Sequence, residues 1–207
     1  MIEVAANQPL FITAIDTDAG KTLTSAIFVQ ALKADYWKPI QAGLPRDTDT
    51  VKALVSTLVN YHPSAYELQM PASPHAAAAV EDITIQTTQI KLPTTQKTLI
   101  IEGAGGLLVP LNDHEVVIDL ASQFEAEVVL VASLYLGSIN HTLLSVQELQ
   151  RRQLPVKGIV FNGTPNPASE QIILQKSRYK KLLHILPEKE VNPTIVKKYA
   201  AQLLPNL

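Results

Sequence analysis

Short apolar runs that do not alternate with polar residues are the feature that most constrains the fold of this chain. Such runs are buried on both faces, as parallel strands between helices are. The strong strand candidates are Leu10–Ile15, Thr98–Ile101, Val128–Ala132 and Val156–Phe161, and the weaker ones are Tyr36–Ile40 and Leu182–Leu186. Amphipathic stretches predict helices at Lys21–Ala34, Thr50–Leu58, Val116–Phe124, Ile139–Arg152 and Ser169–Arg178. Strand followed by helix, repeated, predicts a doubly wound, mostly parallel α/β sheet with helices on both faces.

The composition fits one well-buried core, because 46% of the 207 residues are hydrophobic. No repeat or low-complexity linker interrupts the chain, so we expect a single domain over residues 1–207. We interpret Pro71–Pro93, with its alanine-rich turn Ala76–Ala79, as an irregular excursion from that domain.

Several classes of function are disfavoured by charge and composition. A formal charge of -2 provides no basic face for nucleic acid or an acidic membrane, and we interpret the basic cluster from Lys176 to Lys181 as a solvated surface. The absence of cysteine excludes disulfides and thiol catalysis. Met1–Pro9 lacks the basic start of a secretory signal, and no apolar run reaches the ~20 residues that cross a bilayer. We expect a cytoplasmic protein that binds neither nucleic acid nor membrane.

The segment Asp16–Thr22 lies between the first predicted strand and the first predicted helix, and it ends in Gly20-Lys21-Thr22. At such a junction glycine lets the backbone approach an anion, lysine reaches the β- and γ-phosphates, and a threonine hydroxyl can bind Mg²⁺. The usual leading glycine is missing, since Ile15 stands at its position. Gly-Lys-Thr also begins ordinary helices by chance, but its strand context and the motifs below predict a phosphate site.

Two acidic residues are candidate Mg²⁺ ligands, because magnesium prefers carboxylate oxygens. Glu102 follows an apolar strand and opens the glycine-rich segment Glu102–Gly106, at a strand end where ligands bind in parallel sheets. Asp49 precedes a predicted helix, and an ordinary helix-capping role is an equally good interpretation of it. Lys38, near the end of the second predicted strand, is either a surface lysine or a cation for a transferring phosphoryl group.

Together these motifs resemble the dethiobiotin synthetase family of P-loop enzymes, over roughly residues 10 to 190. The family pattern runs Gly-Thr-Asp-Thr-x-x-Gly-Lys-Thr, Lys-Pro-x-x-x-Gly, an Asp, Ser-Pro-His, Glu-Gly-Ala-Gly-Gly and Leu-Gly-x-Ile-Asn-His. The matching segments of this chain are Ala14–Thr22, Lys38–Gly43, Asp49, Ser73-Pro74-His75, Glu102–Gly106 and Leu136–His141. Asn162 matches the family asparagine that reads adenine.

The resemblance implies a role for each matched residue. Lys38, Lys21 and Thr17 would be catalytic, with Lys38 on the reacting carbamate and γ-phosphate, and Thr22, Asp49 and Glu102 would hold Mg²⁺. Besides Lys21 and these ligands, ATP contacts are implied for Asp18, Ala19, Gly20, Gly103, Ala104, Gly105, Asn162, Gly163 and Pro187. Substrate contacts are implied for Ala42, Gly105, Ser138, Ile139 and Asn140, the last three gripping a carboxylate across a homodimer interface.

The implied reaction is the ATP-dependent carboxylation and ring closure of 7,8-diaminononanoate with CO₂ in biotin biosynthesis. It passes through a carbamate and a carbamic–phosphoric anhydride. Three departures from the family pattern stand out: Ala14-Ile15 at the loop entry, Ala42 in place of a hydroxyl residue, and no aromatic residue around Leu186–Glu188. Among five histidines, none with metal-ligand spacing, His75 and His141 belong to the motifs, and we favour a structural role for both.

Two rival functions have weaker support in the sequence. A partition-type P-loop ATPase, which switches on DNA or membrane surfaces, carries a second lysine early in its phosphate loop, and Thr13–Ala19 contains none. Pro193–Leu207 also lacks the basic composition of a membrane-binding helix. A corrinoid amidating enzyme of the same superfamily would need a glutaminase domain with a nucleophilic cysteine, and this chain has no cysteine.

Overall fold

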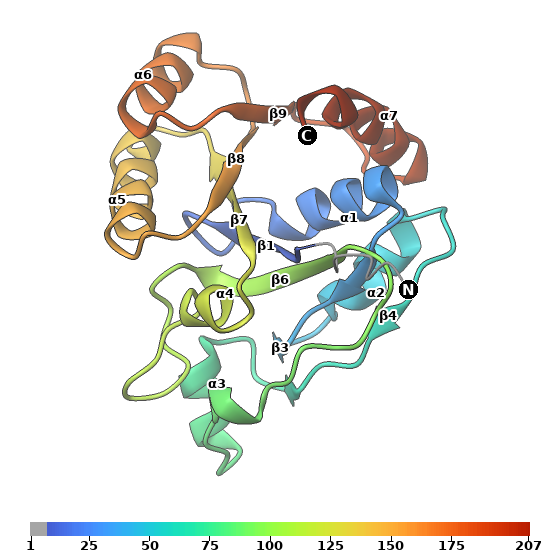
Figure 1. Cartoon of the computed structure of the whole chain (residues 1–207), viewed down its shortest axis with the longest axis vertical. Helices are drawn as coiled ribbons and strands as arrows, with labels where there is room; N and C mark the ends of the chain where they lie inside the picture. The colour runs from blue at the N-terminus through green and yellow to red at the C-terminus, as the bar shows by residue number, and fades with distance from the viewer. Residues whose placement is uncertain (1–7) are drawn as a thin grey trace, which may run out of the picture.

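The computed structural model of the chain describes residues 8–207, so most of the Met1–Pro9 segment lies outside the described residues. The strands and helices alternate through most of the chain (Figure 1). The strands are β1 Leu10–Ala14, β2 Asp35–Trp37, β3 Ile40–Ala42, β4 Tyr61–His62, β5 Tyr66–Leu68, β6 Leu99–Gly106, β7 Glu127–Ser133, β8 Val156–Asn162 and β9 Lys181–Ile185. The α-helices are α1 Lys21–Leu32, α2 Asp47–Leu54, α3 Pro74–Val80, α4 Asp119–Gln123, α5 Ser138–Arg151, α6 Pro167–Ser177 and α7 Pro193–Leu203.

Seven strands form one parallel sheet in the order β4-β2-β6-β1-β7-β8-β9, which confirms the predicted fold class. β1 lies between β6 and β7, with β2, β4 and β6 on one side of it and β7, β8 and β9 on the other. The strand order therefore reverses at β1, and in open parallel sheets ligands bind beyond the carboxyl ends of the strands at this point. β3 and β5 pair separately as a small parallel sheet.

Each face of the sheet carries its own buried cluster, because neighbouring residues of a strand point to opposite faces. Ile12 belongs to the cluster beneath α1, α2 and α7, whereas Phe11 belongs to the cluster beneath α4, α5 and α6. Figure 1 shows the two groups of helices on opposite sides of the strands. None of the helices in residues 8–207 combines the length and the apolar composition that spanning a bilayer requires.

The structure differs from the sequence-based expectations around the second strand. Tyr36–Ile40 is not one strand, because the chain leaves the main sheet after Trp37 and starts β3 at Ile40. Proline at position 39 has no N–H to donate to a ladder, which favours this break. Trp37, just before it, is buried against Phe124 and donates to the Pro63 carbonyl at 3.0 Å.

Other elements extend or add to the expectations. β6 continues through the glycines to Gly106, so Glu102 lies inside the strand instead of ending it. The helix expected from Thr50 already begins at Asp47 and stops at Leu54. The excursion Pro71–Pro93 contains α3 at its alanine-rich turn, and Pro193–Leu203 forms α7, a helix that the sequence patterns did not predict.

Candidate functional site

The phosphate loop joins β1 to α1 at the carboxyl edge of the sheet. Gly20 precedes the helix with φ 102°, a backbone conformation that side chains other than hydrogen strain. A Cβ there would also lie 2.4 Å from Nδ2 of Asn162, at the end of β8. Asn162 in turn donates to the Ala19 carbonyl at 2.9 Å. The positive φ therefore favours glycine at position 20, and a side chain there would also have to displace the Asn162 amide.

Lys21 is buried in the loop with only backbone oxygens as hydrogen-bond partners. Its Nζ donates to the carbonyls of Asp16 at 2.9 Å and Thr17 at 2.8 Å. Burial and then the Lys38 ammonium lower the pKa of Lys21 to about 8, although nearby carboxylates partly oppose the shift. The ammonium is thus a desolvated cation without a carboxylate at ion-pair distance in the described structure, and this is the state that an anionic ligand would relieve.

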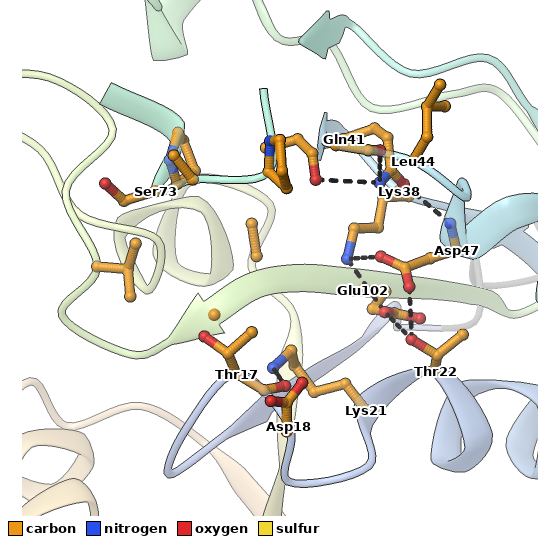
Figure 2. A pocket seen from close by; sticks show the side chains of 18 of the residues that line it. Thr17, Asp18, Lys21, Thr22, Lys38, Gln41, Leu44, Asp47, Ser73 and Glu102 are labelled. Carbon is orange, nitrogen blue, oxygen red and sulfur yellow. Dashed lines mark hydrogen bonds and ion pairs between the residues drawn. The ribbon is translucent and has the colours of Figure 1, made fainter. Parts of the chain in front are cut away.

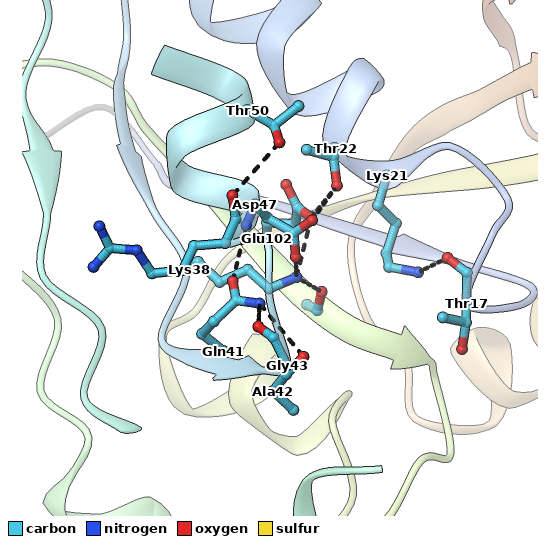
Figure 3. A network of polar contacts seen from close by, with 12 residues as sticks. Thr17, Lys21, Thr22, Lys38, Gln41, Ala42, Gly43, Asp47, Thr50 and Glu102 are labelled. Carbon is cyan, nitrogen blue, oxygen red and sulfur yellow. Dashed lines mark hydrogen bonds and ion pairs between the residues drawn. The ribbon is translucent and has the colours of Figure 1, made fainter. Parts of the chain in front are cut away.

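Lys38 lies in the opposite situation, between two carboxylates (Figure 3). Its Nζ is 2.6 Å from Oδ2 of Asp47 and 3.1 Å from Oε1 of Glu102. The Thr22 hydroxyl lies within hydrogen-bond distance of the same two residues, at 2.8 Å from Asp47 and 2.9 Å from Glu102, and its single proton can be donated to either carboxylate. Although burial alone would lower the pKa of Lys38, the charges of Glu102 and Asp47 outweigh it and raise the pKa.

Glu102 is the most enclosed member of this group, with 1% of its surface exposed. Its second oxygen, Oε2, accepts a hydrogen bond from the Tyr36 hydroxyl at 3.0 Å. Lys38 also donates to the Gly103 carbonyl at 3.1 Å, so the lysine is fixed to β6 at two points. Such a fully hydrogen-bonded arrangement is what a buried charge requires.

Asp49, the expected acidic partner, does not lie in this group. Its carboxylate pairs with Arg46 at 2.9 Å on the exposed side of α2, and 56% of its side-chain surface is accessible. Asp47 instead occupies the position beside Thr22 and Lys38 that was expected for Asp49. The Gln41 side chain accepts a hydrogen bond from the Asp47 backbone N–H at 3.0 Å, and this bond fixes the start of α2. The prediction was therefore two residues away from the carboxylate that meets Thr22 and Lys38.

One cavity of about 470 Å³ is lined by both lysines and by the acidic group (Figure 2). Thr17, Asp18 and Thr22 line it from the phosphate loop and α1. Ala42, Ala104 and Gly105 also line it, as does Ser73 before α3. In Figure 2, Ser73 and Gln41 lie across the cavity from Asp18 and Lys21. The structure thus brings Lys21, Lys38 and Glu102 to one cleft, and leaves Asp49 outside it.

The remaining predicted residues are not among those that line this cleft. Ala19 and Gly20 form the loop backbone behind it. Asn162 ends β8 beside the loop, Gly163 follows that strand, and Pro187 lies beyond the end of β9. Ser138, Ile139 and Asn140 open α5 as expected. Two of their amides are already used within the turn, since Ser138 donates to Tyr135 at 3.0 Å and Asn140 to Gly137 at 3.1 Å.

A second cavity of about 390 Å³ separates the phosphate loop from α5. Thr17 lines both cavities, and Leu108, His141 and Leu144 are among the residues that line the second one. The His141 ring bonds the Tyr135 hydroxyl at 2.5 Å, and the His75 backbone N–H donates to Pro110 at 3.3 Å. The His141 contact involves its ring, whereas the His75 contact involves only its backbone, so the structural role of both remains a prediction.

Sequence reasoning missed three residues of the site: Tyr36, Gln41 and Asp47. Asp47 lies in the same acidic helix start as Asp49, so the pattern contained the signal without deciding between the two carboxylates. Gln41 lies inside the matched Lys38–Gly43 segment, and its side-chain amide, which can both donate and accept hydrogen bonds, was the signal that could have identified it. Tyr36 gave no signal beyond its place in an apolar run.

The parallel α/β sheet and the phosphate loop that borders this cleft define a P-loop nucleotide-binding protein. Comparison with known proteins agrees with this class. A family profile described as an AAA domain matches residues 8–194. The ATP-dependent dethiobiotin synthetase of Cytophaga hutchinsonii is 57% identical over 95% of this chain and 97% of its own length. The enzyme of the same name from Christiangramia forsetii is 49% identical over 92% of this chain and 93% of its own. The chain belongs to the dethiobiotin synthetase family.

Solved structures with a similar fold come from another group. A ParA family ATPase from Chlorobium tepidum aligns with a TM-score of 0.55, 12% identity and 96% coverage of both chains. A putative plasmid partition protein from Borrelia burgdorferi, bound to AMPPNP, aligns with a TM-score of 0.59 and 11% identity, over 96% of this chain and 97% of its own. At this level of identity the likeness is one of fold alone.

Proposed function

We propose that this chain catalyses the ATP-dependent carboxylation and ring closure of 7,8-diaminononanoate to dethiobiotin. One amine captures CO₂ as a carbamate, and a carbamate oxygen attacks the γ-phosphorus of ATP and releases ADP. The second amine then attacks the carbonyl carbon of the mixed anhydride, closes the cyclic urea and expels phosphate. The observation that carries the proposal is the single cleft into which Lys21, Lys38 and Glu102 converge, in a chain 57% identical to an enzyme of this name.

Lys21 and the loop would bind the phosphates. The Lys21 ammonium gives up only two backbone carbonyls when it turns toward an anion, because it has no carboxylate to leave. Thr17, Asp18, Ala19 and Gly20 would contribute the loop contacts, and the positive end of α1 adds to the attraction. Asn162, Gly163 and Pro187 would contact the base, beside the loop.

The oxygen atoms around Thr22 fit Mg²⁺, which is best held by hydroxyl and carboxylate groups. Thr22, Asp47 and Glu102 would hold it, with Asp47 in the role that the sequence suggested for Asp49. The described residues contain no group of three or more acidic or imidazole side chains suited to a metal, so further ligands would come from phosphate and water. When bound, the ion neutralises charge on the phosphates.

Lys38 would act on the reacting groups. Its ammonium is anchored by Asp47 and Glu102 and borders the cleft beside Ala42 and Ala104. A fixed cation in this position stabilises negative charge that develops on a transferring phosphoryl group and on the carbamate. The residues need only position and neutralise, which suits a site without a general-base histidine.

The substrate carboxylate would be bound by the start of α5 from a second copy of the chain. Apolar side chains are exposed in this region, including Leu108, Leu136 and Leu144, with Leu136 fully accessible. Exposed apolar groups of this kind are typical of an interface. Since the Ser138 and Asn140 amides are used within the turn, the Ile139 amide is our candidate for the direct contact.

A phosphate-release assay tests the proposal directly. We expect release from Mg-ATP in the presence of bicarbonate to depend on 7,8-diaminononanoate, with dethiobiotin detected by mass spectrometry. The matched control is 8-aminononanoate, which has one amine and cannot close the ring. Phosphate release that is indifferent to the diamine, with no cyclic product, would instead support a switch ATPase. Light scattering of the same sample tests the homodimer.

A further inference from the structure

The two acidic residues beside Lys38 are each bonded to a neutral side chain from the segment Tyr36–Gln41, Glu102 through its carboxylate and Asp47 through its backbone N–H. On Glu102 the two oxygens are divided. Oε1 accepts from Thr22 at 2.9 Å and Lys38 at 3.1 Å, whereas Oε2 accepts only from the Tyr36 hydroxyl, at 3.0 Å. This hydroxyl therefore sets which oxygen faces the cleft.

Gln41 positions Asp47 through a bond to its backbone. Its Oε1 accepts the Asp47 backbone N–H at 3.0 Å, and its Nε2 donates to the Gly43 carbonyl at 3.0 Å (Figure 3). One amide thus ties the two ends of the turn that leads from β3 into α2. Only 4% of Gln41 is exposed, so water competes little for the hydrogen bonds of its amide. The turn fixes where α2 begins, and hence which aspartate meets Thr22.

Core packing alone does not explain the polar atoms of these residues. Tyr36 is fully buried beside Tyr61, with ring centroids 6.1 Å apart, and a phenylalanine ring would fill the same space. A buried hydroxyl costs free energy unless it is hydrogen-bonded, and here its partner is a carboxylate of the site. The hydroxyl makes a stronger bond to this ionised partner than to a neutral one.

We propose that Tyr36 and Gln41 are positioning residues that orient Glu102 and Asp47 for Mg-nucleotide. This inference rests on the proposed function, since it assigns those two carboxylates to the metal. Hydrogen-bond partners of metal-binding carboxylates typically change metal affinity by about 10- to 100-fold when they are removed. Neither residue would touch the reacting atoms.

The first test is Tyr36→Phe, which removes one oxygen atom and keeps the ring. ATP affinity is measured by calorimetry over a range of Mg²⁺ concentrations and again in EDTA, together with unfolding of the ligand-free protein. We expect the Mg²⁺ concentration at half-maximal enhancement of ATP binding to rise about 10-fold or more, with ATP affinity in EDTA unchanged. Tyr61→Phe is the control, because Tyr61 packs on the same ring outside the acidic group.

The second test is Gln41→Met, which removes the side-chain hydrogen bonds at similar volume. Gln30→Met is its matched control, since Gln30 ties the other end of α2 by bonds to Ser56 and Thr57. We expect only the Gln41 variant to shift the Mg²⁺ dependence, while both variants lower stability.

The outcomes are separable. An unchanged Mg²⁺ dependence in Tyr36→Phe and Gln41→Met, with wild-type protein binding Mg-ATP normally, would overturn this inference and leave the proposed function standing. A shift that the two control variants share would also overturn it, because the effect would then be general loosening. A wild-type protein that binds ATP no better with Mg²⁺ than in EDTA would refute the metal assignment itself, and this inference with it.

Discussion

The phosphate loop and the segment Tyr36–Asp47 each bury a lysine at the edge of the same cleft, but only the second lysine is paired with carboxylates. Lys21 has two backbone carbonyls as partners, and its pKa is lowered to about 8. Lys38 lies between Asp47 and Glu102, and its pKa is raised. Burial opposes the charge of both lysines, so the different outcome comes from the neighbouring carboxylates.

The two lysines therefore differ in what balances their charge: an anionic ligand would balance that of Lys21, whereas carboxylates of the protein already balance that of Lys38. Lys21 is destabilised as it stands, and an incoming phosphate would supply the missing negative charge. Lys38 is held in place before any ligand arrives, and this preorganisation is what electrostatic stabilisation of a transition state requires. Mutating the two lysines should therefore change the stability of the ligand-free protein in opposite directions.

Replacing Lys38 with methionine should have the largest effect. It leaves the buried carboxylate of Glu102 and the half-buried carboxylate of Asp47 beside each other without their cation, and removal of one partner of a buried pair costs about 3–5 kcal/mol. We expect this loss of unfolding free energy in urea titrations, together with loss of turnover. Lys52→Met on the exposed side of α2 is the control, and it should change stability by less than about 0.5 kcal/mol. Equal effects of the two substitutions would contradict the comparison.

Replacing Lys21 with methionine should abolish turnover and yet stabilise the ligand-free protein. The pKa of Lys21 falls from 10.5 to about 8 on folding, so the folded state disfavours the proton. With one pKa unit equal to about 1.4 kcal/mol, the gain at pH 7 should be about 1–3 kcal/mol.

The pH dependence of this gain follows from the sign of the shift. The unfolded chain binds the proton more tightly between pH 8 and pH 10.5, so wild-type stability should rise through this window relative to Lys21→Met. Below about pH 8 the difference between the two proteins should be constant. Urea unfolding at several pH values measures it, and a less stable Lys21→Met protein at pH 7 would contradict the contrast between the lysines.

Asp47→Asn and Asp49→Asn test which of the two aspartates is the acidic partner of Lys38 in the site. We expect Asp47→Asn to lower kcat/KM by at least about 100-fold, because removing a metal-binding carboxylate should cost at least as much as removing its hydrogen-bond partner. Asp49→Asn breaks only an exposed pair with Arg46 and should change the rate less than about 2-fold. A larger effect from Asp49 in steady-state assays would return the role to the residue that the sequence suggested.

Most of the fold was predictable because it depends on strong local patterns. The runs at β1, β7 and β8 are largely apolar on both faces, and together with the weaker run at β9 they mark these strands almost to the residue. Glycine is a poor strand former, so the extension of β6 to Gly106 could not be expected from the sequence. Its pairing with β1, which brings Gly106 opposite Ala14, depends on tertiary contacts.

The site was predictable where one residue type does one job. The meeting of Lys21, Thr22 and Glu102 at one cleft was predictable because a phosphate loop and an acidic strand constrain their identities. The choice between Asp47 and Asp49 depends on which residue starts α2, and that is set by a hydrogen bond from a side chain six positions earlier. Sequence spacing contains no information about that bond.

Trp37, buried against Phe124 and adjacent to Lys38, is the only tryptophan in the chain. Tryptophan fluorescence of the unmodified protein therefore originates from this one core position, next in sequence to Lys38. Emission intensity and wavelength would follow solvent reaching this spot during denaturation, and would also register rearrangement of the adjoining turn when nucleotide binds. The wild-type chain thus carries its own optical probe, with no label to introduce.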